Sequence, residues 1–139
     1  MTLIQNGKVS CCHPDDSGLV FVMYHGIDEC YKCVIKNLEE HIELFDLCDS
    51  LGNVIPMLII SVESEDITEA INIALEKGYP FPLYIDDYWF RTDLNPYLSD
   101  TRFRYFLMSD QHKPVFVGNP ILGEKLKKLF IKSVCLHNN

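Results

Sequence analysis

The sequence LVFVMYHGIDECYKC, residues 19–33, contains the two features that decide the fold. Its first seven residues are a short apolar run rich in β-formers, typical of a strand buried on both faces, and Gly26 ends the run. Its last four residues, Cys30 to Cys33, are a CxxC motif. Beyond the motif, apolar residues recur at steps of three and four up to Gly52, which predicts one long amphipathic helix beginning at Cys30.

A second strand and a second helix follow along the chain. Residues 54–63, VIPMLIISVE, are another apolar run, and Pro56 lies near its start, where no ladder donor is needed. Asp66 and Glu69 have the spacing of a capping box and predict the start of a helix that ends near Gly78. This alternation of strand and helix predicts parallel strands joined by right-handed helical crossovers.

The second half of the chain has a different pattern. Residues 81–86 predict a short strand and residues 87–100 an irregular aromatic loop. Residues 103–109 and 114–117 flank the turn DQHK and predict an antiparallel hairpin, which a Gly-Asn-Pro break separates from a final helix. We therefore expect one α/β domain over residues 1–139. It has a central mixed sheet of about four strands, helices on both faces, a C-terminal hairpin plus helix, and residues 1–18 as an N-terminal arm.

Charge and hydropathy restrict the partners of the chain. It has 12 basic and 20 acidic residues, a net charge of -8 spread along its length, so nucleic acid and anionic membrane surfaces are disfavoured. No apolar run approaches the roughly 18 to 20 residues of a membrane helix, and residues 1–8 lack the apolar stretch of a secretory signal. We expect a soluble monomer without a cofactor, either cytoplasmic or a mature segment from which a signal has been removed.

The CxxC motif is the candidate reactive centre. Unpaired N–H groups at a helix start favour a thiolate, so Cys30 is the expected nucleophile. Cys33 lies on the same face of the first turn, closer to the core, and is the expected resolving thiol, which attacks a mixed disulfide formed on Cys30. Lys32 favours the thiolate, whereas Asp28 and Glu29 oppose it.

Two alternatives to redox chemistry remain open at this stage. The first is a metal-binding variant, in which Cys30 and Cys33 share a zinc ion with Cys11, Cys12 or His13, although adjacent Cys11 and Cys12 lack the usual ligand spacing. The second is a redox-inert binding module.

The remaining candidate residues receive structural interpretations. Cys48 and Cys135 are expected to be small buried hydrophobes. His25 ends the first strand beside the motif and is a secondary candidate for aiding the thiolate. The other histidines have no partner at a telling spacing. An aromatic cluster is expected to cover one end of the core rather than line a groove; its members are Tyr79, Phe81, Tyr84, Tyr88, Trp89 and Phe90.

Residues 19–134 resemble the thioredoxin-like thiol-disulfide oxidoreductases of the bacterial cell envelope. The resemblance comprises the CxxC motif, the segment YPFPLYIDD at residues 79–87 and the run YFLMSDQHKPVFVGNPI at residues 105–121. It implies a thioredoxin-like fold, a periplasmic location, protein thiols or disulfides as substrates, a reductant partner, and Cys30 and Cys33 as the redox pair. The sequence departs from the family pattern in two places. The family's cis-proline is replaced by Thr101-Arg102-Phe103, and its buried acid by Tyr24.

Overall fold

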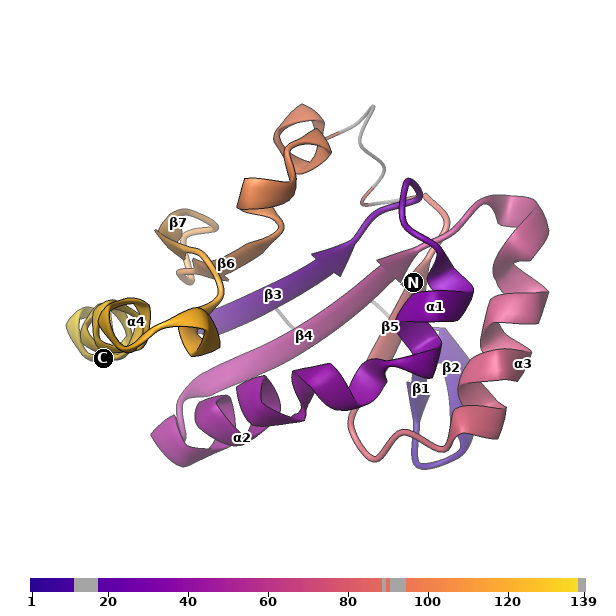
Figure 1. Ribbon diagram of the computed structural model, residues 1–139, viewed down its shortest axis with the longest axis horizontal. Helices are drawn as coiled ribbons and strands as arrows, with labels where there is room; N and C mark the ends of the chain where they lie inside the picture. The colour runs from indigo at the N-terminus through magenta and orange to yellow at the C-terminus, as the bar shows by residue number, and fades with distance from the viewer. Residues whose placement is uncertain (12–17, 89, 91–94, 138–139) are drawn as a thin grey trace.

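The computed structural model describes residues 1–11, 18–88, 90 and 95–137. Within them the strands form a seven-stranded sheet in the order β2-β1-β5-β4-β3-β6-β7 (Figure 1). The strands are β1 Thr2–Gln5, β2 Lys8–Cys11, β3 Leu19–His25, β4 Val54–Ser61, β5 Leu83–Asp86, β6 Tyr105–Met108 and β7 Pro114–Val117. Strands β3, β4 and β5 are parallel, and every other neighbouring pair is antiparallel. The sheet is therefore mixed, as predicted, but larger than the predicted four strands.

The N-terminal residues account for part of this difference. Strands β1 and β2 form a hairpin through Asn6 and Gly7, both with positive φ, and β1 pairs with β5. An Asn-Gly turn between two short strands is a strong local hairpin signal because both residues tolerate positive φ. The prediction that residues 1–18 form an arm is thus wrong for residues 2–11, which extend the sheet.

The helices are α1 Tyr31–Lys36, α2 Ile42–Leu51, α3 Ile67–Lys77 and α4 Glu124–Leu136. Short 3-10 helices connect the elements: η1 Leu38–His41, η2 Ser64–Asp66, η3 Pro96–Ser99, η4 Thr101–Phe103 and η5 Pro120–Leu122. The predicted capping box does not form, because the side chain of Asp66 makes no capping hydrogen bond. Glu69 instead accepts from Tyr31 and pairs with Lys32, and these contacts join α3 to α1.

The predicted helix from Cys30 to Gly52 is interrupted at Asn37. This residue leaves the helical conformation, and its side-chain amide donates to the carbonyl oxygen of Cys33 at 2.9 Å. Asparagine competes with helical hydrogen bonding in this way because its short amide reaches nearby backbone groups. The chain continues as η1, which buries Leu38 and His41, before α2 begins. The break therefore brings His41 into the interior.

All four helices cover the same face of the sheet, which corrects the prediction of helices on both faces (Figure 1). The crossovers from β3 to β4 and from β4 to β5 move in one direction, and right-handed crossovers that do so place their helices on one side. Helix α4 joins them, since Phe130 packs edge-on against Phe21 and Phe116. The opposite face carries Val20, Val22, Tyr24, Met57, Ile59 and Phe106, which cluster with Leu98 of η3.

The architecture around the CxxC motif agrees with the prediction. Strand β3 pairs in parallel with β4 on one side and antiparallel with β6 on the other. Strands β6 and β7 form the predicted hairpin, and α4 follows it. Strand β5 follows α3 in the sequence, precedes the β6–β7 hairpin and pairs in parallel with β4 as a third parallel strand. The chain is thus a mixed α/β protein in which the CxxC motif follows a central strand.

Candidate functional site

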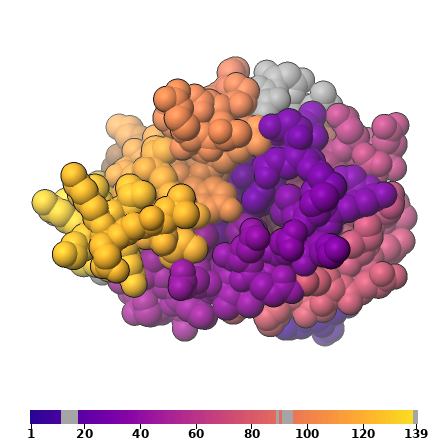
Figure 2. All heavy atoms as spheres, viewed as in Figure 1, coloured from indigo at the N-terminus to yellow at the C-terminus, as the bar shows by residue number. Residues whose placement is uncertain are grey.

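Cys30 and Cys33 form a disulfide at the start of α1, with their Cα atoms 5.2 Å apart. Both residues are exposed. Helix α1, which begins at this disulfide, lies on the face seen in Figure 2, between the atoms of α3 and those of the residues that precede β6. The expectation that Cys33 faces inward is wrong, because Ile35 is the α1 residue that enters the core. A thiol-containing partner can therefore approach either residue.

The two cysteines differ in their backbone environment. Cys30 is the N-cap of α1, and its Sγ accepts the backbone N–H of Cys33 at 3.2 Å. A hydrogen bond of this kind favours a negatively charged sulfur. Lys32 contributes less than expected, because its Nζ pairs with Glu69 at 2.9 Å.

The loop between β3 and Cys30 is held by Glu29 and Arg104. One carboxylate oxygen of Glu29 accepts from the Gly26 N–H and from Arg104 Nη1, both at 3.1 Å. Arg104 Nη2 reaches Asp28 at 2.9 Å, and its Nε donates to the Leu98 carbonyl at 2.8 Å. A Cβ on Gly26 would lie 2.5 Å from Asp28 Oδ1 and 3.0 Å from Arg104 Nη2, so a side chain at this position would displace the ends of this ion pair. The loop before the disulfide is therefore braced by a buried guanidinium.

Behind the loop lies a pair of histidines in contact. His25 Nδ1 is 2.9 Å from Glu29, and its Nε2 is 2.8 Å from Nε2 of His41. The hydroxyl of Tyr105 is 3.0 Å from the same nitrogen of His41. His25 was a secondary candidate from the sequence, whereas the sequence analysis missed His41 and Arg104. No spacing signal marks them, since His41 is 16 residues from His25 and Arg104 is 75 from Glu29.

Burial and charge perturb the ionisable groups of this network. Burial, together with the neighbouring His25, lowers the pKa of His41 to about 4. For Glu29, burial acts to raise the pKa, but His25, the Gly26 N–H and Arg104 outweigh it and leave the pKa lowered. Burial, and next the charges of Glu29 and Glu40, raise the pKa of Tyr105. Near neutral pH, Glu29 is thus ionised and Tyr105 keeps its hydroxyl proton.

At two positions the structure, like the sequence, differs from the thioredoxin-like proteins that the sequence resembles. No cis peptide bond occurs in the described residues, and Arg104, which precedes β6, accepts the Tyr24 N–H through its carbonyl at 2.9 Å. Tyr24 is 1% exposed and donates its hydroxyl to the Phe90 carbonyl at 2.6 Å. Burial raises its pKa, so Tyr24 is no proton acceptor for a cysteine.

Cys11, one of the possible zinc ligands, lies far from the CxxC pair. Cys11 ends edge strand β2, and three strands separate β2 from β3, a span of about 19 Å at the usual strand spacing. Cys12 and His13 lie outside the described residues. Where the structure describes the chain, it contains no group of three or more potential metal ligands.

Of Cys48 and Cys135, which were both expected to be buried, Cys48 is buried. Burial raises the pKa of its thiol to about 12. Cys135 is exposed on α4, which contradicts that expectation.

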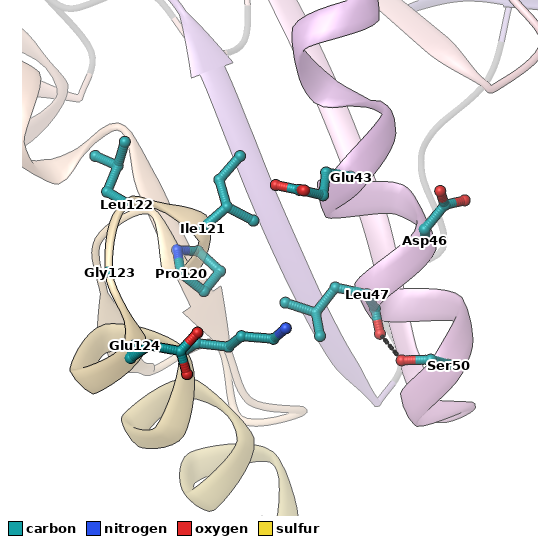
Figure 3. A pocket seen from close by; sticks show the side chains of 10 residues that line it. Glu43, Asp46, Leu47, Ser50, Pro120, Ile121, Leu122, Gly123 and Glu124 are labelled. Carbon is teal, nitrogen blue, oxygen red and sulfur yellow. Dashed lines mark hydrogen bonds between the residues drawn. The ribbon is translucent and has the colours of Figure 1, made fainter.

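Other features of the surface lie outside the disulfide region. A cavity of about 540 Å³ opens between α2 and the η5–α4 segment, and acidic Glu43, Asp46 and Glu124 line it (Figure 3). None of its lining residues belongs to the disulfide or the histidine network. In the aromatic cluster, Phe81 stacks on Phe45 and Tyr79 packs against both, as expected of core residues. Tyr88 is exposed instead, and Trp89 lies outside the described residues.

No protein-family model, curated protein or solved structure matches this chain. In the part of the chain that is described, no helix is long and apolar enough to cross a membrane. The geometry of the site itself must therefore carry the functional conclusion.

Proposed function

We propose that this protein is a thiol-disulfide oxidoreductase that exchanges its Cys30–Cys33 disulfide with protein thiols. The observation that carries the proposal is an exposed CxxC disulfide directly after the carboxyl end of a buried parallel strand. In open α/β sheets this edge is where ligands and substrates commonly bind. A CxxC pair in this setting is typical of redox chemistry.

The exchange proceeds through a mixed disulfide. A substrate thiolate attacks Cys30 Sγ, the bond between the two cysteine sulfurs breaks, and Cys33 leaves as a thiolate that takes up a proton. A second substrate thiolate then attacks the substrate sulfur, and Cys30 leaves with the electron pair. Two electrons have passed from the substrate dithiol to the cysteine pair. The reverse sequence reduces a substrate disulfide.

The unequal roles of the cysteines depend on hydrogen bonding rather than on burial. Both cysteine residues are exposed, but Cys30 Sγ accepts the Cys33 N–H. Stabilisation of its thiolate makes Cys30 the better leaving group and the more ionised thiol. Cys30 is therefore the proposed exchange residue and Cys33 the resolving residue.

A thioredoxin-like assignment is part of the proposal. The β3–α1–α2–β4 unit and the β6–β7–α4 unit support it, whereas β5, a predicted short strand, pairs in parallel with β4 and makes the sheet larger than the predicted four strands. An oxidising compartment such as the periplasm suits an exposed disulfide, and a thiol reductant is the partner that returns the pair to its dithiol form.

A redox-inert binding module is the second candidate. It is favoured by the segment before β6, where Thr101–Phe103 form η4 and Arg104 turns inward onto the Glu29 loop. In thioredoxins a cis-proline in this segment pairs with extended substrates. A different segment here favours a partner that binds without exchange.

Trapping of mixed disulfides distinguishes the two functions. Cys33→Ser should accumulate covalent adducts with proteins that contain a disulfide, because the Cys30 thiolate attacks that disulfide and no resolving thiol releases the adduct, and Cys30→Ser should accumulate none. In the unmodified protein, a redox titration of the Cys30–Cys33 pair against glutathione should be reversible and should give a midpoint potential. Equal trapping by both variants, or no exchange at all, would favour the binding module.

A further inference from the structure

The His25–His41 pair has one arrangement of protons that its surroundings favour. Its two Nε2 atoms are 2.8 Å apart, so one of them must donate and the other accept. His25 Nδ1 faces the ionised Glu29, which only accepts, so this nitrogen carries a hydrogen. The hydroxyl of Tyr105 lies within 3.4 Å of both Nε2 atoms and can donate or accept. The remaining partner, the Leu38 carbonyl, then decides between two states.

In the first state both rings are neutral. His25 Nε2 is bare, so His41 donates from Nε2, and the bare Nδ1 of His41 faces the Leu38 carbonyl oxygen at 3.4 Å. In the second state His25 is an imidazolium that donates from Nε2 to His41. Nδ1–H of His41 then faces the Leu38 oxygen as a donor. In the first state two acceptors face each other, the bare Nδ1 of His41 and the Leu38 oxygen. The second state avoids this and adds one proton to the pair.

The extra proton changes the charge beside Cys30. Asp28 and Glu29 are negative and Arg104 is positive, so these three groups sum to one negative charge. A protonated His25 brings the sum to zero. The charge of exposed Glu40 acts on Tyr105, which is itself neutral, and stays the same in both states of the pair. Because Glu29 directly precedes Cys30, a Cys30 thiolate forms beside a less negative cluster while the histidine pair holds its extra proton.

We propose that His25 and His41 form a proton-holding pair, in which His25 is the positioning residue whose charge favours reduction of the Cys30–Cys33 disulfide. The inference rests on the proposed function, since the pair must accept electrons. In the exchange with glutathione, two glutathione thiols supply two electrons and become a disulfide. The two glutathione thiols release two protons. Cys33 takes up one of them, and the other stays in solution when Cys30 is a thiolate. A pair without its extra proton does not stabilise that thiolate.

Nuclear magnetic resonance of ¹⁵N-histidine-labelled protein tests the proton arrangement without reference to redox activity. Near pH 6.5, both ring nitrogens of His25 should be protonated in the oxidised protein, and His41 should be neutral with its hydrogen on Nδ1. Reduction of the disulfide should shift the His25 signals. A neutral His25 beside an Nε2–H tautomer of His41, or His25 signals identical in oxidised and reduced protein, would overturn the proposal.

The equilibrium with glutathione tests the effect on the disulfide. At pH 6, His25→Gln should lower the equilibrium constant for reduction about tenfold, and the difference from the unmodified protein should shrink at pH 8. His41→Leu should act in the same direction because leucine has no acceptor for the shared proton, and it serves as the second variant if His25→Gln does not fold. His137→Gln is the matched control, since His137 is exposed at the end of α4 and its ring bonds the Ser133 carbonyl, away from the disulfide and the histidine pair.

Two results separate this inference from the proposed function. If His25→Gln has the same pH profile as His137→Gln, the inference fails, whatever the trapping experiment shows. If the glutathione profile depends on His25 as expected but neither cysteine variant traps a protein, the proposed function alone fails.

Discussion

Arg104→Met should lower the free energy of unfolding by about 3 kcal/mol near pH 7. The Arg104 side chain is 5% exposed and makes three polar contacts, with the Leu98 carbonyl, Glu29 and Asp28. A hydrogen bond from a charged group contributes about 1.5 to 3 kcal/mol when it is shielded from water. The Asp28 pair adds about 1 kcal/mol or less, because the Asp28 side chain is 56% exposed. Methionine keeps packing against the Tyr24 ring, so the loss reports mainly on the polar contacts.

Urea titration followed by circular dichroism measures this loss, with the midpoint and slope compared between variants. Arg102→Met is the matched control. Arg102 is 79% exposed, and its side chain contacts only sequence neighbours among the described residues, Asp100 as an ion pair and the ring of Phe103, so its replacement should leave the midpoint unchanged within error. A loss below about 0.5 kcal/mol for Arg104→Met would refute the bracing role, since a surface substitution has an effect of that size. Equal losses of unfolding free energy for Arg104→Met and Arg102→Met would also refute the bracing role.

Three further predictions concern the core, the buried histidine and the thiols. Phe130→Ala should cost about 3 to 5 kcal/mol of unfolding free energy because Phe130 is fully buried, whereas Leu129→Ala at a half-exposed position should cost far less; equal losses in thermal melts would contradict the packing of α4. The pKa of His41 falls from 6.5 to about 4 on folding, so the unfolded chain takes up a proton first and stability is lost as pH falls through this window, by about 3 kcal/mol in total. His41→Gln should make the urea midpoint depend less on pH between pH 6.5 and 4. An unchanged pH dependence would count against a neutral buried ring. In the reduced protein, iodoacetamide should modify Cys30 before Cys33 in peptide mass spectra, and faster modification of Cys33 would reverse the assigned roles.

Local sequence patterns predicted the elements that depend on neighbouring residues. The apolar run of β3, the turn before β7 and the CxxC motif at a helix start all appear where the pattern placed them. Each depends on interactions within a few residues, such as side-chain period, turn chemistry and N-capping. The Asn6-Gly7 hairpin had a signal of the same kind, which the sequence analysis passed over.

The errors concern features that depend on competition or on long-range packing. The break at Asn37 reflects a side chain that competes with the helix, where apolar periodicity alone predicts continuity. The placement of every helix on one face follows from the strand order, which became known only from the pairing of β3, β4 and β5. The exposure of Cys33 follows from which residue of α1 meets the core.

The sequence by itself determined that a CxxC pair lies at the start of a helix after a buried strand, because these are local properties of residues 19–33. Only the tertiary structure decided the charges around that pair. The register of β3 with β6 places Tyr105 opposite Met23, and the interrupted helix turns His41 back onto His25. Arg104 reaches the loop from a segment far along the chain. Contacts between residues so distant in sequence leave no periodic signal, because they arise from strand pairing and from the packing of the interior.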